Sequence, residues 1–175
     1  MLRLIAVLLT ILAPVALAED VLSPPPDIIP REYLQELDEV VVIGTRGELN
    51  VYVFIDEAKI CFIPRGWEST HCFNALVGKD TLPGEYNLKR YRIMVPAYGG
   101  DILAYRENAT SIWSIHRVIS VPGQNRLKRI TSDKIKNRIG VTAGCINVMP
   151  DVFDLLVDCC SNSRIKITTM RAPGG

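Results

Sequence analysis

A cysteine stands in a loop of small residues, the stretch GVTAGCINV over residues 140–148. Gly144 precedes Cys145, and the absence of a side chain there lets a substrate approach the backbone closely. Backbone N–H groups in such a turn can point at a developing oxyanion, which supplies a large share of acyl-transfer catalysis. Cys145 is therefore the candidate nucleophile, and it needs a neighbouring base or cation because only the thiolate attacks.

The base must come from one of two histidines, His71 and His116. A lone histidine is more often structural than catalytic. His116 follows the apolar run 111–115, however, and the end of a strand is a place from which a rigid sheet can aim an imidazole at a loop. It also lies nearer the cysteine loop in sequence, so it is the better candidate. Ser114 and Arg117 flank it, and either could orient the imidazole.

The chain holds five cysteines. An odd number in an exported protein leaves at least one thiol outside any disulfide. Cys61 and Cys72 fall on successive predicted strands and could face each other across a hairpin. Cys159 and Cys160 are neighbours, and because a bond between neighbours is strained we expect at most one of them to be bridged. Cys145 is thus predicted to keep its thiol, and the absence of a C-x-x-C motif makes a thiol–disulfide exchanger a weak alternative.

The order of His116 and the segment GCIN, residues 144–147, resembles the catalytic signature of the L,D-transpeptidases with the YkuD-type fold. In that family a histidine precedes a segment of the form Ser-x-Gly-Cys-x-Arg/Asn. The stretch DTLPGEYNL, residues 80–88, is similar to the family's Thr-Pro-Thr-Pro-Gly region before a strand. The insert over residues 116–148 is similar to a proteobacterial branch of the family. The resemblance extends over residues 40–170.

The resemblance implies a mainly β, sandwich-like catalytic domain with short helices, and a cysteine acyl-enzyme mechanism. Family members cut the bond after the third residue, a diamino acid, of a peptidoglycan tetrapeptide stem, and D-alanine leaves. The acyl group then passes to an amine on another stem, to a protein lysine, or to water. Carried over by position, Cys145 is the nucleophile and His116 is the base that moves the thiol proton to the leaving amine. Gly144 and Cys145, with Ala143, would offer the oxyanion N–H groups.

Three positions depart from the usual family pattern. Arg117 stands where a glycine or serine commonly follows the histidine, and Thr142 replaces a serine but keeps its hydroxyl. Ala143 stands where histidine is common. Asn147 occupies a position held by arginine in many members and by asparagine in some, and it is expected to hold substrate or the loop. The departures bear on substrate choice more than on chemistry, so all four positions are candidate substrate contacts.

A basic cluster lies in the insert: Arg126, Lys128, Arg129, Lys134, Lys136 and Arg138. It is either the solvated face of a lid or a cationic rim for the carboxylates of a stem peptide. In the second case Arg129 and Arg138 are the expected contacts, because a guanidinium pairs with a carboxylate through two hydrogen bonds.

The net charge, the aspartates and the aromatic residues exclude some other functions. The net charge of +1 argues against a nucleic-acid binder. Scattered aspartates lack metal-ligand spacing, so no metal or other cofactor is expected. Three aromatic residues are interpreted as core or rim packing rather than as ligand platforms: Tyr91, Tyr105 and Trp113.

The leading hypothesis is an exported peptidoglycan L,D-transpeptidase that acts on tetrapeptide stems in cell-wall cross-linking or remodelling. Its partners would be peptidoglycan stem peptides and, in one variant of the hypothesis, a wall-anchored lipoprotein. One alternative is an L,D-carboxypeptidase or a hydrolase of wall cross-links or lipoprotein linkages, with the same cysteine and histidine. Another is a wall-binding domain without catalysis, although such a domain needs neither Cys145 nor His116.

The start of the chain predicts export. Arg3, an apolar run over residues 4–17 and the site Ala16-Leu17-Ala18 are typical of a cleavable signal peptide, residues 1–18. The alternative, a membrane anchor, is disfavoured because the apolar run is short, so no membrane span is expected after cleavage. Residues 19–38 are predicted to be a proline-rich linker with a short helix, and the periplasm is the expected location.

Most elements that must position the candidate residues are predicted to be strands within one domain, residues 39–175. Alternating and β-branched runs predict strands over residues 40–43, 49–55, 60–63, 71–77, 86–95, 102–105, 111–115 and 165–170. Helices are predicted over residues 31–38, 132–137 and 150–159. The fold class is therefore mainly β with short helices.

Overall fold

The computed structural model describes residues 28–36, 47–93, 95 and 98–169. The predicted signal peptide, the first part of the linker and the strand predicted over residues 40–43 lie outside the described residues, as does the end of the last predicted strand. In the ranges that are described, no helix is both long enough and apolar enough to span a membrane.

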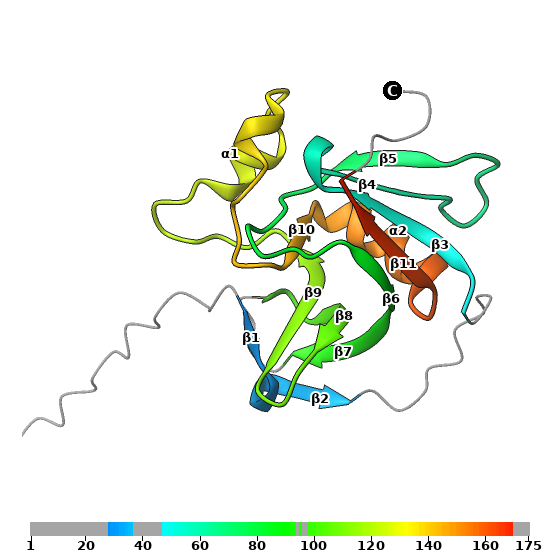
Figure 1. The fold of residues 1–175 in the computed structure, drawn as a ribbon, viewed down its shortest axis with the longest axis horizontal. Coiled ribbons are helices and arrows are strands. Elements are labelled where there is room, and N and C mark those ends of the chain that lie inside the picture. Colours follow the sequence, from blue (N-terminus) through cyan, green and yellow to red (C-terminus); the bar gives the residue numbers. More distant parts are fainter. Residues whose placement is uncertain (1–27, 37–46, 94, 96–97, 170–175) are drawn as a thin grey trace, which may run out of the picture.

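Short strands make up most of the described chain (Figure 1). The strands are β1 (Ile29–Pro30), β2 (Leu34–Glu36), β3 (Leu49–Phe54), β4 (Lys59–Phe62), β5 (His71–Asn74), β6 (Gly84–Asn87), β7 (Lys89–Ile93), β8 (Asp101–Glu107), β9 (Ser111–Arg117), β10 (Ile146–Val148) and β11 (Arg164–Thr168). The helices are α1 (Arg126–Ile130) and α2 (Pro150–Cys160), with 3-10 turns at Arg31–Tyr33, Ile55–Glu57 and Ile135–Asn137. The predicted fold class, mainly β with short helices, is confirmed.

The strands form two sheets. In the first sheet the order is β1-β9-β8-β7-β2, and β10 also pairs with β9; in the second sheet it is β5-β4-β3-β11-β6. β1 lies beside the start of β9 and β10 beside its end, so the two short strands follow each other along one edge of β9. Helix α1 lies on the side of β10 (Figure 1), and Asn74 Nδ2 on β5 donates to Ile130 O of the helix at 3.1 Å.

Side-chain alternation in β8 buries both faces of the first sheet. Leu103 and Tyr105 join the main core between the sheets, where helix α2 also packs. Ile102 and Ala104 join a smaller core on the opposite face, together with Tyr98. This period of two explains why these strands were predictable from sequence.

One predicted strand, over residues 86–95, is two strands in two different sheets. β6 pairs with β11 in the second sheet, and β7 pairs with β8 and β2 in the first. The chain changes sheets at Leu88, which is buried and whose N–H donates to Ser163 O at 2.9 Å. The prediction of one strand was wrong because the alternating pattern continues through the crossing point.

Two predicted helices also differ from the structure. The helix predicted over residues 31–38 is a single 3-10 turn followed by β2, because the edge of β7 offers a pairing partner that propensity does not take into account. The helix predicted over residues 132–137 is reduced to a 3-10 turn, and α1 lies before it. Ile130 at the end of α1 is buried against Leu76 and Val141, which fixes the helix there.

Candidate active site

The end of β9 and the start of β10 bring the two predicted catalytic residues close together. β10 pairs with β9 in parallel, and Asn147 lies opposite His116. Side chains alternate along a strand, so Ser114 and His116 share one face of β9, and Cys145 and Asn147 share that face next to them. Cys145 Sγ lies 3.9 Å from Ser114 Oγ. The thiol and the imidazole are therefore placed on one face of the first sheet by neighbouring strands.

Hydrogen bonds at both ring nitrogens hold the imidazole of His116. Nδ1 lies 2.7 Å from Arg117 O, and Nε2 lies 3.0 Å from Asn147 Nδ2. A carbonyl oxygen only accepts, so Nδ1 carries the proton. The ring of Tyr98 packs edge-on against it at 5.5 Å between centroids. The question left open by the sequence is thereby answered: Arg117, through its backbone carbonyl, orients the imidazole.

Four successive carbonyl groups of the cysteine loop, residues 142–145, accept hydrogen bonds. The bonds are Lys79 N to Thr142 O at 3.0 Å, Asp80 N to Ala143 O at 3.2 Å, Thr81 Oγ1 to Gly144 O at 2.9 Å, Tyr105 OH to Gly144 O at 2.6 Å, and Thr142 Oγ1 to Cys145 O. In a trans peptide the C=O and the following N–H point in opposite directions. The N–H groups of residues 143–145 therefore face away from the donors that hold these carbonyls, and their role as oxyanion donors stays a prediction.

Tyr105 is one of the buried side chains among these anchors. Burial raises the pKa of Tyr105 above its ordinary value, and the nearby charge of Cys145 raises it further. The hydroxyl therefore stays protonated and donates to Gly144 O throughout the physiological pH range. Thr81 completes the anchor, because its hydroxyl donates to Gly144 O and accepts from Gly78 N at 3.0 Å.

The sequence had led us to expect that the bare Cα of Gly144 is open to a substrate. In the structure it is covered by protein. A Cβ at Gly144 would lie 2.5 Å from Cδ1 of Trp113, so the indole ring occupies the space that the glycine leaves. The guanidinium of Arg106 stacks on the same ring, 3.7 Å from its centroid. Trp113 is therefore a packing residue of the cysteine loop, as was predicted for it in general terms.

Three of the predicted substrate contacts belong to the cysteine loop and to β10. Asn147 is fully buried and bonds to His116 and Arg126. Thr142 is also buried, and its hydroxyl donates within the loop. Ala143 is partly exposed, so its contact with substrate stays a prediction. The geometry favours a positioning role for Asn147 and Thr142.

Arg117 points away from Cys145. Its side chain lies on the opposite face of β9 from His116, donates to Gly99 O at 3.1 Å and pairs with Asp154 on α2. Its guanidinium also lies 4.3 Å from the ring centroid of Phe153. This arrangement makes the Arg117 side chain a link between β9 and α2 and favours that structural role over a substrate contact.

The two arginines expected to bind stem carboxylates are bonded within the insert. Arg129 Nε donates to Asn137 O at 2.6 Å. Arg138 donates to Ser132 O and, at 3.1 Å, to Glu57 O, and it is almost fully buried. Burial also lowers the pKa of the Arg138 guanidinium from its ordinary value. These contacts favour a structural role for both residues over a cationic rim.

Sequence reasoning missed four residues that hold the site: Gly78, Thr81, Tyr105 and Arg126. Thr81 lies in the stretch DTLPGEYNL, which was noticed only for its resemblance. Arg126 was counted in the basic cluster, yet it is buried, and its Nη1 donates to Asn147 Oδ1 at 3.2 Å. Its Nε donates to Gln124 Oε1 at 2.7 Å. Nothing in the local sequence distinguishes this arginine from its exposed neighbours.

All five cysteines are described, and four of them form disulfides. Cys61 and Cys72 are directly opposite each other on β4 and β5 and are bonded, as predicted. The expectation that at most one of Cys159 and Cys160 is bridged was wrong, because they are bonded to each other. They end α2, where the following residues no longer constrain the backbone as they do inside a helix. Cys145 is left outside both disulfides, as predicted.

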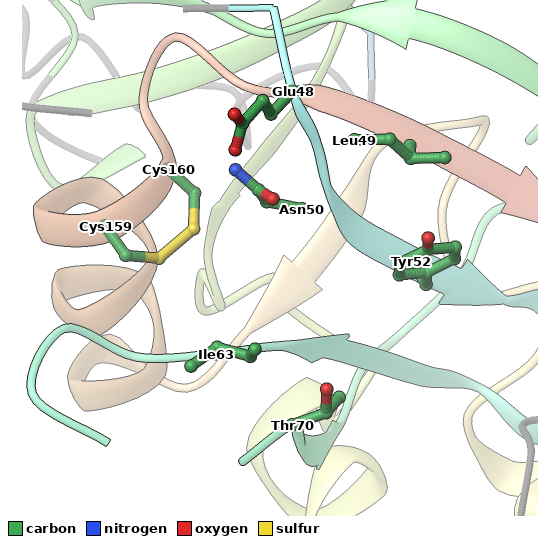
Figure 2. Close-up of a pocket in the computed structure, with 8 residues that line it drawn as sticks. All are labelled: Glu48, Leu49, Asn50, Tyr52, Ile63, Thr70, Cys159 and Cys160. Carbon is green, nitrogen blue, oxygen red and sulfur yellow. A yellow bond between two sulfur atoms is a disulfide. The ribbon is translucent and has the colours of Figure 1, made fainter. Parts of the chain in front are cut away.

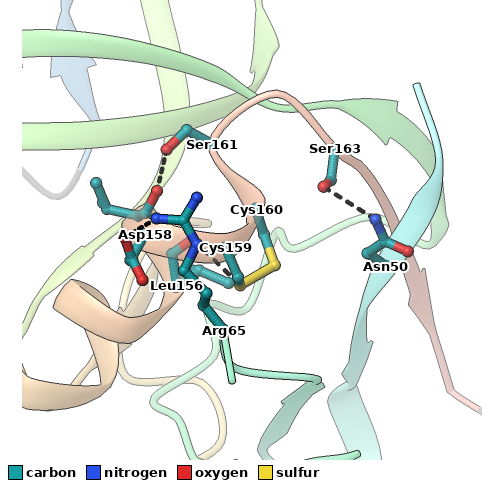
Figure 3. The surroundings of a disulfide bond; sticks show 9 residues. Asn50, Arg65, Leu156, Asp158, Cys159, Cys160, Ser161 and Ser163 are labelled. Carbon is teal, nitrogen blue, oxygen red and sulfur yellow. Dashed lines mark hydrogen bonds and ion pairs between the residues drawn. A yellow bond between two sulfur atoms is a disulfide. The ribbon is translucent and has the colours of Figure 1, made fainter. Parts of the chain in front are cut away.

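A cavity of about 460 Å³ lies beside the Cys159–Cys160 disulfide (Figure 2). It is lined by Glu48, Leu49, Asn50, Tyr52, Ile63, Thr70, Cys159 and Cys160. Around the disulfide, Asn50 Nδ2 donates to Ser163 Oγ at 3.4 Å and Arg65 pairs with Asp158 at 3.2 Å (Figure 3). The cavity contains none of the predicted site residues. It lies at the far end of the 11-residue helix α2 from β10, a helix length of about 16 Å.

The reactive side chains at the strand-pair site are thus one thiol and one imidazole. Both are enclosed, Cys145 with 0% and His116 with 2% of its surface exposed. Among the described residues, no three His, Cys, Asp or Glu side chains gather as a group that could hold a metal ion. A thiol, an imidazole and backbone N–H groups are the groups that a cysteine acyl-transfer site uses.

The solved structures that are similar to the chain include the following two. The crystal structure of an L,D-transpeptidase (Yku) from Stackebrandtia nassauensis aligns with 83% of this chain and 62% of its own, at a TM-score of 0.46 and 14% identity. The structure of Bd1075 from Bdellovibrio bacteriovorus aligns with 82% of this chain and 54% of its own, at a TM-score of 0.45 and 22% identity. The chain thus spans less than two thirds of each of these structures. No protein-family model matches the chain, and no curated protein matches it.

Proposed function

We propose that the chain is an exported cysteine acyltransferase, an L,D-transpeptidase of peptidoglycan tetrapeptide stems. One observation carries the proposal. The cysteine that is left outside both disulfides shares a sheet face with a histidine whose Nδ1 is tied to a backbone carbonyl. A thiol nucleophile needs a base nearby, so this placement supports the proposal together with the GCIN motif in the sequence.

The reaction would proceed through a thioester. His116 Nε2 takes the proton from Cys145 Sγ, and the sulfur attacks the carbonyl carbon of the third stem residue. The N–H groups of residues 143–145 stabilise the oxyanion of the tetrahedral intermediate. The C–N bond then breaks, and D-alanine leaves with the proton that His116 held. An amine of a second stem attacks the thioester, which forms the new amide and returns the thiol.

The enclosure of Cys145 adds one requirement. Because none of its surface is exposed, a stem peptide can reach the sulfur only after a neighbouring segment moves. Residues 118–141, which connect β9 to the anchored cysteine loop and carry α1, are the segment that we expect to move. Location in the periplasm and action on a wall-anchored lipoprotein belong to the same proposal and depend on the export signal in the sequence.

Mass spectrometry of purified tetrapeptide muropeptides tests the proposal. Incubation with the protein should produce a 3–3 cross-linked dimer and free D-alanine, and Cys145→Ala should abolish both. His116→Gln should lower the rate by about 10²–10⁴-fold. His71→Gln is the matched control, because His71 lies on β5 and bonds to Ser69.

Other products would change the conclusion in defined ways. Tripeptide without dimer would show that water is the acceptor, as in a carboxypeptidase. Cleavage of cross-linked or lipoprotein-linked muropeptides, but not of tetrapeptides, would identify a hydrolase of those linkages. Binding to wall fragments with no Cys145-dependent product from any of these substrates would refute the enzymatic proposal in favour of a wall-binding domain.

A further inference from the structure

A buried series of side chains connects the insert to the predicted base. Arg126, the first residue of α1, donates from Nη1 to Asn147 Oδ1 at 3.2 Å. Asn147 Nδ2 lies 3.0 Å from His116 Nε2, and His116 Nδ1 lies 2.7 Å from Arg117 O. Arg126, Asn147 and His116 are each at most 2% exposed, so bulk water does not compete for these hydrogen bonds.

The chemistry at the two ends of this series fixes the direction of every bond. A guanidinium only donates, so Arg126 selects the oxygen of the Asn147 amide and turns the NH₂ group toward His116. That NH₂ group also only donates, so Nε2 must present its lone pair. The backbone carbonyl at the other end only accepts, so Nδ1 must carry the proton. In the other tautomer the proton on Nε2 would face the NH₂ group of Asn147. The lone pair of Nδ1 would face the carbonyl oxygen of Arg117.

We propose that Arg126 is a positioning residue, which acts through Asn147 to hold His116 as the neutral Nδ1–H tautomer with Nε2 as its basic nitrogen. The inference rests on the proposed function, in which His116 takes the thiol proton. Arg126 lies in the insert between β9 and β10. Two hydrogen bonds, Arg126 to Asn147 and Asn147 to His116, connect it to the base.

The same series disfavours an imidazolium in the resting site, because a proton on Nε2 would face the NH₂ group of Asn147. Three other described residues lie around the ring: Tyr98 presents a ring edge, Arg117 offers its carbonyl while its guanidinium pairs with Asp154, and Cys145 lies on the same face. Proton transfer from sulfur to Nε2 requires the Asn147 amide to move away first.

Nitrogen-15 NMR of the imidazole rings tests this in the absence of substrate. The chain has two histidines, and His71→Gln assigns the signals of His116. In the wild-type protein the Nδ1–H tautomer of His116 should exceed the other by at least about tenfold, since the reverse loses two buried hydrogen bonds. Arg126→Met should lower that ratio by about tenfold, and Arg126→Lys, which still donates, should restore part of it. A folded Arg126→Met variant with the wild-type ratio would overturn the proposal.

Asn147→Asp provides a second test that keeps the buried guanidinium paired. A carboxylate accepts from both neighbours, so His116 should carry protons on both nitrogens at neutral pH. An unchanged neutral tautomer in this variant would also overturn the proposal, even if Arg126→Met does not fold.

Kinetics then separate this inference from the proposed function. Arg126→Met should lower kcat, and because Arg126 is buried we expect KM to stay nearly unchanged. If the tautomer responds as expected but no wall substrate is turned over, the positioning role stands and the proposed function fails. If turnover is found but the tautomer does not respond to either variant, the proposed function stands and the role of Arg126 fails.

Discussion

Gly78 lies so close to Gly144 that a Cβ at Gly78 would come within 2.3 Å of Gly144 N and 2.4 Å of its Cα. The same Cβ would lie 2.6 Å from Thr142 Oγ1. Gly78 N also donates to Thr81 Oγ1, which in turn donates to Gly144 O. The cysteine loop therefore rests directly on the backbone at Gly78, and no residue with a side chain fits there without a shift of the loop.

Gly78→Ala should disturb the loop and lower both stability and activity. We expect a loss of about 1–3 kcal/mol in the free energy of unfolding, because the added methyl group overpacks the contact. The rate of acyl transfer should fall further than this loss explains, since Gly144 N is one of the proposed oxyanion donors. Urea denaturation and muropeptide turnover measure the two effects. Lys79→Ala is the control, because Lys79 is exposed and its backbone bond to Thr142 O is retained.

Tyr105→Phe should loosen the anchor of Gly144 while the ring stays in the core. Loss of the 2.6 Å hydrogen bond should lower the free energy of unfolding by about 0.5–1.5 kcal/mol. Tyr91→Phe is the matched control, because Tyr91 OH bonds to Glu107 at 2.8 Å on the other face of the sheet. Both variants should lose similar stability, but only Tyr105→Phe should lower kcat. Equal kcat values for the two variants would contradict the role of this anchor.

Arg117→Ala separates a structural role from substrate binding. The ion pair with Asp154 is partly exposed and contributes about 0–1 kcal/mol, to which the contact with Phe153 adds packing. We therefore expect a small loss of stability and an unchanged KM. Asp154→Ala should reproduce the ion-pair part of the effect. A KM raised about tenfold or more in Arg117→Ala alone would instead show that the guanidinium binds the stem peptide.

The first sheet should lose stability in acid through Asp101. Burial raises the pKa of Asp101, but hydrogen bonds and charges from Arg90 and Arg92 outweigh burial and leave the pKa below its ordinary value. The contribution of this carboxylate is therefore fully present above the ordinary carboxyl pKa of about 3.9 and is lost as the pH falls through the lower, folded-state value. Asp101→Asn should cost about 1–3 kcal/mol at pH 7 and remove that part of the acid dependence.

Urea denaturation at pH 7 and at pH 3 measures the effect of Asp101. Glu85→Gln is the control, because Glu85 forms exposed pairs with Arg164 and Lys166 that contribute little. If the wild-type protein and Asp101→Asn lose the same stability between the two pH values, the carboxylate does not contribute as described.

The two disulfides predict how many cysteines an alkylating reagent can modify before and after reduction. Denatured but unreduced protein should take up one equivalent of iodoacetamide, at Cys145, and reduced protein should take up five, one at each cysteine. Cys159→Ser should raise the unreduced count to two, because it releases Cys160. An unreduced count of three in the wild-type protein would show that the neighbouring cysteines are not bonded to each other. Peptide mapping would then identify the modified residues.

Features of the fold that depend on the local pattern of residues could be predicted from the sequence. Alternation in β8 and β9, the hairpin that pairs Cys61 with Cys72, and the cysteine left outside the disulfides could all be inferred because each is a matter of neighbours along the chain. The candidate roles of Cys145 and His116 came from the resemblance in motif order rather than from local pattern, and they stay a prediction.

Features that depend on distant segments were missed. The change of sheets at Leu88 is set by its bond to Ser163, far along the chain. The contact of Gly78 with Gly144 and the bond from Tyr105 to Gly144 likewise join segments that no sequence window contains. The disulfide between Cys159 and Cys160 was missed for another reason, since a general rule about strain was applied to a helix end.

The parallel pairing of β9 with β10 has a consequence for how this protein can evolve. Parallel neighbours need a long connection, and here that connection is residues 118–145. Its length and composition are not fixed by the strand register that aligns Asn147 with His116. Insertions or deletions there can reshape what the site admits while the nucleophile and base keep their spacing. Within that connection, Arg126 and the cysteine loop at residues 142–145 are the parts that we expect selection to hold constant.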